Sequence, residues 1–224
     1  MSKITYEIRK ISTLSDNDKR EMFSLMQNAY KNVHWENFTN DLKNKNYLIR
    51  LIDQQEDLCG FSTVQLFTSS FLNETVNIVY SGDTIIAPAY WGSLQLPLAY
   101  GKILKSIKQK DSRRLFWMLI SKGFRTYRCL PVFFHEFYPS YNRETPKELQ
   151  VFMDRLAMNK FPSHYKDGII YAEKNGQSLK TELDVKEQHF RLNDPHIEFF
   201  LKSNPGYYKG NELLCITEFN EENI

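Results

Sequence analysis

The feature of the sequence that most constrains the fold is the stretch from Val76 to Leu119, where strand-like and helix-like patterns follow one another closely. A β-rich run over Val76–Ile86 ends at Pro88, and a turn with one glycine, AYWGS, follows. A helical pattern then continues to about Gln109, and the apolar run LFWMLIS predicts a second strand. Strand, turn, helix and strand in this order form a crossover unit. Its two strands are expected to lie side by side and parallel unless the sheet splays between them.

The turn before the helix is a predicted phosphate site. The helix is expected to begin at Gly92–Ser93, and the first amides of a helix have no acceptor within it and lie at the positive end of its dipole. Such an end suits a phosphate group. The residues alone leave a second interpretation open, because Gly92 also permits a tight turn and Ser93 is also a common helix cap.

Length and charge bound the class of protein. A chain of 224 residues with 42% hydrophobic and 25% charged residues predicts a packed globular domain. We expect a single domain over residues 1–224, with a core over residues 1–142 and a divergent C-terminal part over residues 143–224. The formal net charge of +2 is too small to indicate a nucleic acid as a partner. No pattern in the sequence predicts an oligomeric state.

Cysteine usage and the N-terminus favour the cytoplasm. Cys59, Cys129 and Cys215 are widely spaced and form no CxxC motif, which argues against a disulfide framework and against a zinc site. The first residues, MSKITYEIRK, lack the apolar run of a signal peptide, and no window holds the roughly 18 apolar residues of a membrane span. We therefore expect a cytoplasmic protein with no metal site and no membrane span.

Periodicity predicts the remaining elements. Alternating residues over Ile4–Ile11 predict a strand, and a helical pattern capped by Ser15 or Asp16 continues to about Tyr30–Asn32. The further expected elements are a helix over Trp35–Lys45, strands over Tyr47–Ile52 and Leu58–Phe67, a helix over roughly Gly123–Leu130, a helix capped by Thr145 with Pro146 in its first turn and ending near Asn159–Lys160, a strand over Gly168–Ala172, an exposed loop over Glu173–Asp184, a helix capped by Asp194 to about Lys202, and a strand over Glu212–Phe219. Together they predict an α/β (α+β) fold: a mixed, mostly antiparallel sheet with helices on both faces and a helical C-terminal elaboration.

This order of elements resembles the GNAT superfamily of acyl-CoA-dependent N-acyltransferases. The resemblance covers roughly Ile4 to Tyr141 and implies that the fourth and fifth strands part to admit the pantetheine of the cofactor. In the family, a loop of the pattern Arg/Gln-x-x-Gly-x-Gly/Ala wraps the pyrophosphate, and Ala89–Leu94 is the corresponding loop here. This loop keeps one glycine, lacks the leading Arg or Gln and ends in Leu94.

The resemblance also implies a cofactor and its binding residues. The expected donor is acetyl-CoA or a longer acyl-CoA, or the thioester of an acyl carrier protein, which some members with degenerate loops use. The residues expected to bind it are Ile85 and Ile86 at the end of the fourth strand, and Trp91, Gly92, Ser93 and Leu94 in the loop.

Acyl transfer to an amine needs a base, and burial raises the pKa of a carboxylate toward neutrality. Asp83 follows Glu74 as the next acidic residue of the fourth strand and is the predicted base. The sequence SGD around it is also typical of a hydrogen-bonded bulge. His135 is a second candidate base, and a packing role is its alternative.

Family members often carry a tyrosine after the fifth strand that protonates the departing thiolate. Tyr138 is the predicted acid, and Tyr127 and Tyr141 compete with it for this role. Cys129 has no His or Asp at a suitable spacing, so we set it aside as a nucleophile.

Two further sets of residues have a structural and a functional interpretation. A basic set is expected either to be solvated or to bind the 3′-phosphate of the cofactor or an acidic carrier protein; it comprises Lys102, Lys105, Lys108, Lys110, Arg113 and Arg114. Phe133, Phe134 and Phe137 are expected in the core, and lining an acyl-chain tunnel is the alternative.

Two functions from different classes remain. The first is an acyltransferase that moves an acyl group from acyl-CoA or acyl carrier protein to a small-molecule amine. The second is a catalytically inactive module of the same fold that binds a ligand or a protein partner, which the loop with a single glycine favours.

Overall fold

The computed structural model describes residues 4–173, 178–180 and 194–224. The chain divides into two compact units, one formed by Met1–Phe67 with Val79–Ser112 and the other by Thr68–Ile78 with Arg113–Ile224. We call these the first unit and the second unit and describe each by itself. The long strands β4 (Leu58–Phe71) and β5 (Glu74–Ile86) contribute to both.

The first unit contains the N-terminal elements and the helix after the glycine turn. Its other elements are β1 (Thr5–Lys10), η1 (Ile11–Thr13), α1 (Asp16–Ala29), β2 (Tyr30–Lys31), α2 (Trp35–Leu42), β3 (Tyr47–Ile52), η2 (Pro88–Tyr90) and α3 (Gln95–Lys110). β1 and β4 each pair antiparallel with β3, and the β3–β4 register shifts between Leu51 and Ile52. Ser15 caps α1 in a reciprocal capping box with Asp18, which explains why the helix begins there.

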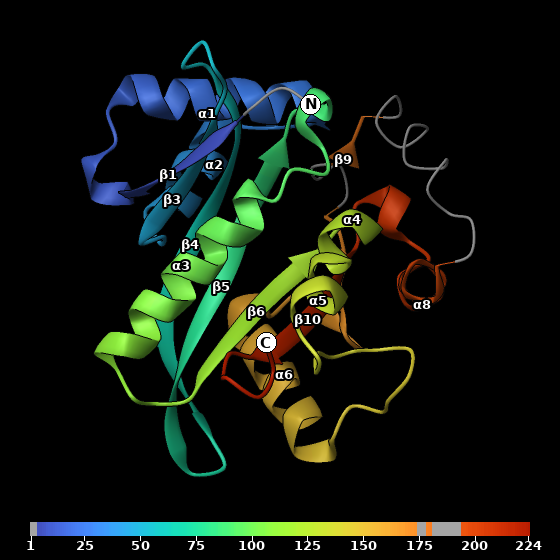
Figure 1. Cartoon of the computed structure of the whole chain (residues 1–224). Coiled ribbons are helices and arrows are strands. Elements are labelled where there is room, and N and C mark those ends of the chain that lie inside the picture. The colour runs from blue at the N-terminus through green and yellow to red at the C-terminus, as the bar shows by residue number, and fades with distance from the viewer. Residues whose placement is uncertain (1–3, 174–177, 181–193) are drawn as a thin grey trace. The chain divides into compact units, whose positions relative to one another are not determined.

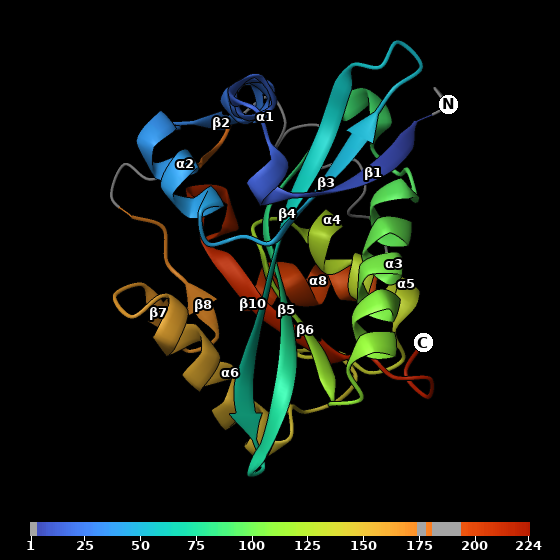
Figure 2. The same cartoon turned by 90° about the vertical axis from the view of Figure 1, so that its left-hand side faces the viewer.

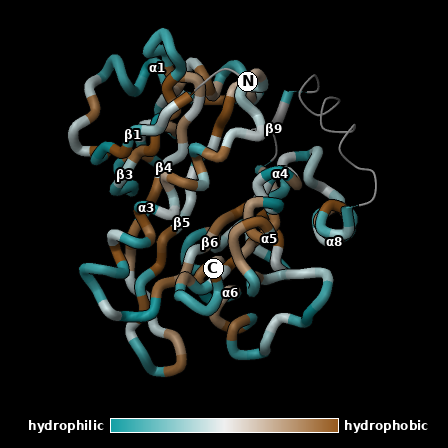
Figure 3. The backbone as a smooth tube through the Cα atoms, viewed as in Figure 1, coloured by the Kyte–Doolittle hydropathy of each residue, from teal (hydrophilic) through white to brown (hydrophobic). Residues whose placement is uncertain are grey.

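Helices cover both faces of the sheet in the first unit (Figures 1 and 2). α1 and α2 pack on one face through Met22, Met26 and Phe38, which form a cluster with Phe61 of β4 and Ile85 of β5. α3 lies on the other face, and apolar and polar residues alternate along it (Figure 3). β3, in the middle of this sheet, is buried from Leu48 to Leu51, in keeping with its apolar sequence.

The second unit is built around the antiparallel pair of β6 (Leu115–Ser121) and β10 (Glu212–Glu218), in which Phe116 lies opposite Glu218. β8 (Ile169–Ile170) pairs with β10, and β7 (Tyr165–Lys166) with β8. The unit also contains α4 (Phe124–Tyr127), α5 (Cys129–Phe133), α6 (Lys147–Lys160), β9 (Ser178–Leu179), α8 (Pro195–Ser203) and η4 (Tyr207–Lys209).

Aromatic side chains form the core of the second unit. Tyr127 is fully buried and its ring lies 5.8 to 6.0 Å from the rings of Phe137, Phe199 and Phe200 (centroid to centroid). Of the three phenylalanines expected in the core, Phe134 and Phe137 are buried and Phe133 is half-buried.

The predicted fold class is confirmed. The hydrogen-bonded strand order is β1-β3-β4-β5-β6-β10-β8-β7, in a mixed and mostly antiparallel sheet. The order of elements on which the GNAT resemblance rests is also confirmed, from β1 through α1, α2, the hairpin strands, the glycine turn and α3 to β6. The amide of Asn77 in β5 donates to the carbonyl of Arg114, just before β6, at 2.8 Å.

Several boundaries differ from the prediction. Pro146 is itself the N-cap of α6 and Thr145 provides no side-chain cap, because the first helical residue is Lys147. The helix expected over Gly123–Leu130 is divided at Arg128 into α4 and α5. Of the loop expected over Glu173–Asp184, residues 174–177 and 181–184 lie outside the described residues.

The described residues contain neither a membrane-spanning helix nor a cluster of metal ligands. None of the helices in the described ranges combines the length and apolar character that crossing a bilayer requires. In the same part of the chain, no group of three or more His, Cys, Asp or Glu side chains is arranged to hold a metal ion.

Candidate functional site

The predicted phosphate loop ends β5 in the first unit and turns at Gly92. Gly92 has a φ of 86°, in the left-handed region where glycine is favoured, and open space surrounds the position of a Cβ atom. The backbone conformation, and not crowding, is therefore what favours glycine at this position. Leu94 is the N-cap of α3, two residues later than the predicted start at Gly92. Its side chain points into solvent, with 58% exposed.

The amides of this loop are partly engaged. The Ser93 amide donates to the Tyr90 carbonyl at 3.3 Å, and the Ser93 hydroxyl accepts from the Gln95 amide at 3.2 Å. Ser93 thus caps the first turn of α3. Within the described part of the chain, the amides of Gly92 and Leu94 form no hydrogen bond. These two amides lie at the positive end of a 16-residue helix and are available to an anion.

Two aromatic side chains hold the loop in place. The Trp91 indole donates to the Ile86 carbonyl at 2.8 Å, and the Tyr90 hydroxyl donates to Asp53 at 3.0 Å. This bond raises the pKa of the Tyr90 phenol above its ordinary value. The loop is therefore anchored to the end of β5 and to the β3–β4 turn. Trp91 is one of the predicted cofactor-binding residues. Its side chain is half-buried, and its indole N–H is already used in the hydrogen bond to Ile86.

β5 contains a bulge directly before this loop. A Cβ atom on Gly82 would lie 2.3 Å from the Thr63 hydroxyl, so Gly82 faces the same side of the sheet as Thr63 and, two residues earlier in β4, Phe61. Ile85 packs in the cluster with Phe61 on that same side. Residues three apart share a face only where the alternation of a strand is broken by an extra residue. The bulge lies between Gly82 and Ile85, as one interpretation of the SGD sequence predicted.

A chain of three hydroxyl groups joins this part of β5 to α3. The Ser62 hydroxyl lies 2.6 Å from the Thr84 hydroxyl and 2.6 Å from that of Tyr100. Ser62 is fully buried and Tyr100 nearly so. The bonds fix α3 against β4 and β5, and so fix the direction in which the start of α3 points. Asp83 is half-buried within the bulge.

A buried lysine faces the bulge and has no counterpart in the predicted site. The side chain of Lys45 is 2% exposed, and its ammonium group binds Asp41 at 2.7 Å. It also lies 5.3 Å from the centre of the Tyr80 ring and 3.2 Å from the position of a Gly82 Cβ. A buried charge is costly unless it is paired. No local pattern in the sequence KNKN distinguishes Lys45 from an exposed turn lysine.

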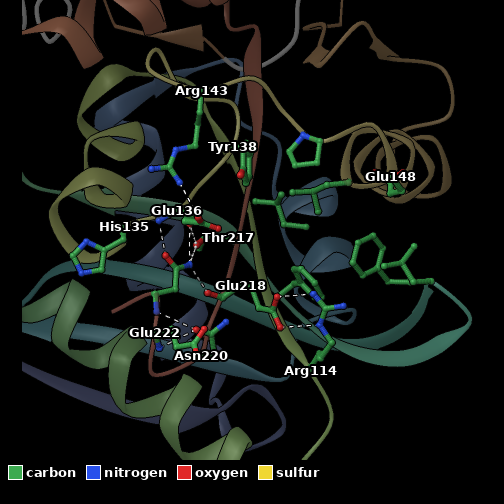
Figure 4. A pocket seen from close by; sticks show the side chains of 17 residues that line it. Arg114, His135, Glu136, Tyr138, Arg143, Glu148, Thr217, Glu218, Asn220 and Glu222 are labelled. Carbon is green, nitrogen blue, oxygen red and sulfur yellow. Dashed lines mark hydrogen bonds and ion pairs between the residues drawn. The ribbon is translucent and has the colours of Figure 1, made fainter.

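The second unit contains a cavity of about 750 Å³ (Figure 4). The cavity lies where the start of β6, the end of β10, the segment before α6 and the C-terminal tail meet. The residues that line it are Phe71, Leu72, Arg114, Phe116, His135, Glu136, Tyr138, Arg143, Pro146, Glu148, Leu149, Ile216, Thr217, Glu218, Asn220, Glu222 and Asn223. Two of the three predicted catalytic residues, Tyr138 and His135, are among them.

Tyr138 is held by the backbone. Its amide donates to the Ile216 carbonyl at 2.9 Å, and the Ile216 amide donates back to its carbonyl at 2.8 Å. This bridge attaches the segment to β10 and leaves the half-buried phenol at the cavity. The competing tyrosines lie elsewhere: the Tyr127 hydroxyl donates to the Pro139 carbonyl at 3.0 Å, and Tyr141 lies outside the lining of the cavity. Burial raises the pKa of Tyr127 far above its ordinary value.

His135 and the C-terminal tail are joined through Asn223. The His135 amide donates to the Asn223 carbonyl at 3.0 Å. His135 is exposed, so it does not have the packing role that was the alternative to a catalytic base. The buried Asn223 side chain donates to the carbonyls of Glu136 and Glu218 at 2.9 and 2.7 Å. The tail thus supports the segment that carries both His135 and Tyr138.

Two members of the basic set have structural partners. Arg114 forms two hydrogen bonds with Glu218, which raise its pKa, and Lys108 donates to the Ser112 carbonyl at 3.0 Å. All three cysteines are free thiols. Burial raises the pKa of the Cys129 thiol to about 11, so it is protonated at neutral pH and is a poor nucleophile.

The structure brings the predicted cofactor residues together in the first unit. Ile85, Ile86, Trp91, Gly92, Ser93 and Leu94 follow the bulge that contains Asp83. Tyr138 and His135 come together in the cavity of the second unit. Sequence reasoning missed Lys45 and the Ser62–Thr84–Tyr100 bonds, since their partners are far apart along the chain.

A comparison with protein-family models finds no match, and a comparison with curated proteins finds none either. A comparison with solved structures finds likeness at low identity. A conserved protein of unknown function from Enterococcus faecalis is 17% identical, with a TM-score of 0.44; the match covers 57% of this chain but only 32% of that one. The GNAT family N-acetyltransferase YhbS of Escherichia coli, solved with CoA, is 11% identical over 59% of this chain and 73% of that one, with a TM-score of 0.41. The ribosomal-protein-S18-alanine N-acetyltransferase of Escherichia coli is 12% identical over 63% and 86%, with a TM-score of 0.42.

Proposed function

We propose that this chain transfers an acyl group from a thioester to the amine of a small molecule. The observation that carries the proposal is the bulge between Gly82 and Ile85, which leads directly into the left-handed turn at Gly92 and the start of α3. A bulge takes one residue out of the strand ladder, so its backbone groups can bind a ligand. The free amides of Gly92 and Leu94 suit the phosphate of the same ligand.

The donor is acetyl-CoA, a longer acyl-CoA or the thioester of an acyl carrier protein. The loop Trp91–Leu94 binds its phosphate, and the backbone of Ile85 and Ile86 aligns its pantetheine. A backbone amide of β5 polarises the thioester carbonyl, which requires no charged side chain. The three free thiols are in keeping with a reducing compartment such as the cytoplasm.

Transfer takes place within a complex of both substrates. The amine attacks the thioester carbon, a C–N bond forms, and Asp83 accepts the proton of the amine. The C–S bond then breaks, and Tyr138 donates its proton to the departing thiolate. The structure supports Tyr138 over Tyr127 because the Tyr127 hydroxyl is buried against the Pro139 carbonyl.

A second candidate function is a binding module without turnover. It is favoured by the Ser93 amide and hydroxyl, both of which form hydrogen bonds inside the loop. Such a module would bind the thioester or a related phosphate compound and release no thiol.

Amine-dependent release of the CoA thiol tests the enzymatic proposal. Asp83→Asn and Tyr138→Phe are each expected to lower kcat by about 10²-fold or more, the usual contribution of a general base or acid. The matched control Tyr141→Phe, whose ring is exposed and outside the cavity, is expected to keep wild-type kcat. If Asp83→Asn transferred at the wild-type rate across the pH range, Asp83 would have no part in the reaction.

Thermal unfolding separates the two candidate functions. A bound thioester at 100 times its Kd is expected to add about 2.7 kcal/mol to the free energy of unfolding. Stabilisation without thiol release in the presence of any amine would favour the binding module. No stabilisation by acetyl-CoA, long-chain acyl-CoA or acyl carrier protein thioester would contradict both.

A further inference from the structure

We infer that three hydroxyl groups in the first unit, those of Ser62, Thr84 and Tyr100, set the distance between the two halves of the proposed donor site. One half is the phosphate loop at the start of α3, and the other is the end of β5, whose backbone aligns the pantetheine. Ser62 and Tyr100 are thus positioning residues, which act through the backbone rather than by contact with the donor. The inference rests on the proposed function for the identity of the ligand, but its test measures binding and needs no turnover.

The three side chains meet on the α3 face of the sheet. Phe61 of β4 packs against α1 and α2. Successive side chains of a strand point to opposite faces, so the neighbouring Ser62 faces α3. Its hydroxyl lies 2.6 Å from that of Thr84 in β5 and 2.6 Å from that of Tyr100 in the second turn of α3. Two strands and a helix are therefore joined at Ser62.

The protons of the three hydroxyl groups follow one direction. The Thr84 hydroxyl donates to the Gly82 carbonyl at 3.2 Å. A hydroxyl group has one proton, so Thr84 accepts from Ser62, and Ser62 in turn accepts from Tyr100. The series of donors begins on α3 and ends on the carbonyl of Gly82, where the bulge of β5 begins.

Burial makes these hydrogen bonds costly to break. Ser62 and Tyr100 are both buried, and Thr84 is half-buried. A buried hydroxyl group that loses its partner is removed from water without compensation. A shift of α3 along the sheet would break the bond between Tyr100 and Ser62, so the helix is held at one position relative to β5.

The loop that connects β5 to α3 is anchored elsewhere. The Trp91 indole donates to the Ile86 carbonyl, and the Tyr90 hydroxyl donates to Asp53. These two bonds hold the loop to the end of β5 and to the β3–β4 turn, and neither reaches α3. The bonds through Ser62 are what join the helix after the loop to the strand before it.

This connection matters for a ligand that occupies both halves of the site. Such a ligand gains from its second half only when the spacing of the two half-sites matches its own length. Acetyl-CoA spans both halves, whereas acetyl-pantetheine and adenosine 3′,5′-bisphosphate each occupy one. Loss of the Ser62 or the Tyr100 hydroxyl is therefore expected to weaken the binding of acetyl-CoA and to leave that of the two half-ligands unchanged.

Titration of the full chain with each of the three ligands, followed by its amide NMR signals, tests the inference and also measures weak binding. Ser62→Ala removes the centre of the series, and Tyr100→Phe removes its end on α3. The matched control is Tyr6→Phe, which removes a hydroxyl group from another tyrosine of the first unit; the ring of Tyr6 lies 5.9 Å from the ammonium group of Lys102 in α3. Thermal unfolding verifies that each variant is folded.

We expect the wild type and the control to bind acetyl-CoA more tightly than either half-ligand. Both Ser62→Ala and Tyr100→Phe are expected to bind acetyl-CoA about three- to tenfold more weakly, the usual effect of one hydrogen bond, and to bind the half-ligands as the wild type does. Wild-type affinity for acetyl-CoA in either variant would overturn the inference. So would an equal loss of affinity for a half-ligand, because it would show a general loosening of the fold rather than a change in spacing.

The outcome is distinguishable from that of the proposed function. Binding of acetyl-CoA that is unchanged in Ser62→Ala and Tyr100→Phe would leave the proposed function intact and overturn this inference alone. A wild type that binds none of the three ligands would contradict the proposed CoA donor and overturn this inference with it.

Discussion

Gly82 lies where β5 departs from regular alternation, in contact with side chains that are buried on β4 and after α2. A Cβ atom at this position would be 2.3 Å from the Thr63 hydroxyl and 2.6 Å from Cε of Lys45. Thr63 is fully buried and its hydroxyl has no hydrogen-bond partner among the described residues. The bulge therefore depends on a glycine, and any larger residue would displace Lys45 or Thr63.

Gly82→Ala is expected to lower the free energy of unfolding by about 1–3 kcal/mol, the usual cost of overpacking a core. Gly101→Ala in α3 is the matched control, since a Cβ atom there meets nothing within 4 Å. Alanine within a helix is favoured over glycine, so this control is expected to gain about 0.5–1 kcal/mol. Chemical denaturation measures both. If Gly82→Ala were as stable as the wild type, the bulge would have space for a Cβ atom, which would contradict these distances.

His196 is a residue from which we expect a pH dependence of stability just below neutral pH. Its ring lies 4.8 Å from that of Tyr141 and 5.8 Å from that of Phe137. Burial is the main cause that lowers its pKa below the ordinary value of 6.5; Arg128 lowers it further and Asp194 opposes the shift. The unfolded chain thus binds the proton more readily, so the stability that neutral His196 provides is present above pH 6.5 and is lost as the pH falls below it.

His196→Phe is expected to flatten the fall in the free energy of unfolding below pH 6.5, and the exposed-site control His34→Gln is expected to leave it unchanged. Urea denaturation at a series of pH values measures the slope. A slope that persists in His196→Phe would assign the pH dependence to other groups.

At the scale of elements, local patterns predicted the segments well and their contacts poorly. The helix after AYWGS and the cap at Asp194 follow from short-range rules, and the structure confirms both. The bulge in β5 was only one of two interpretations of SGD, because the face on which Gly82 lies is set by Thr63 of the neighbouring strand. Thr145 was mistaken for a cap because the sequence does not decide whether Pro146 stands at the first helical position or before it.

The candidate site shows the same limit. The turn at Gly92 could be predicted from the sequence because glycine is the residue most favoured in a left-handed turn. The cavity could not, since its lining extends from Phe71 to Asn223 and depends on the fold of the second unit. Three tyrosines competed for one role, and only their burial and hydrogen bonds distinguish Tyr138 from Tyr127.

At the scale of the whole molecule, the proposed transfer depends first on the thioester. The first unit contains the bulge, Asp83 and the loop that is proposed to bind this donor. Every step of the proposed transfer requires the thioester. Its binding by the loop at Gly92 is therefore the central claim.

The most direct test is the affinity of acetyl-CoA and of acetyl-pantetheine, which lacks the phosphates, for the wild type and for Gly92→Ala, measured by calorimetric titration. Alanine in the left-handed conformation costs about 1–2 kcal/mol, so the variant is expected to lose the turn before it loses the fold. We predict that the wild type binds acetyl-CoA about tenfold or more tightly than acetyl-pantetheine, and that Gly92→Ala loses this difference. Equal affinity of the wild type for the two thioesters, or an unchanged preference in Gly92→Ala, would contradict the account.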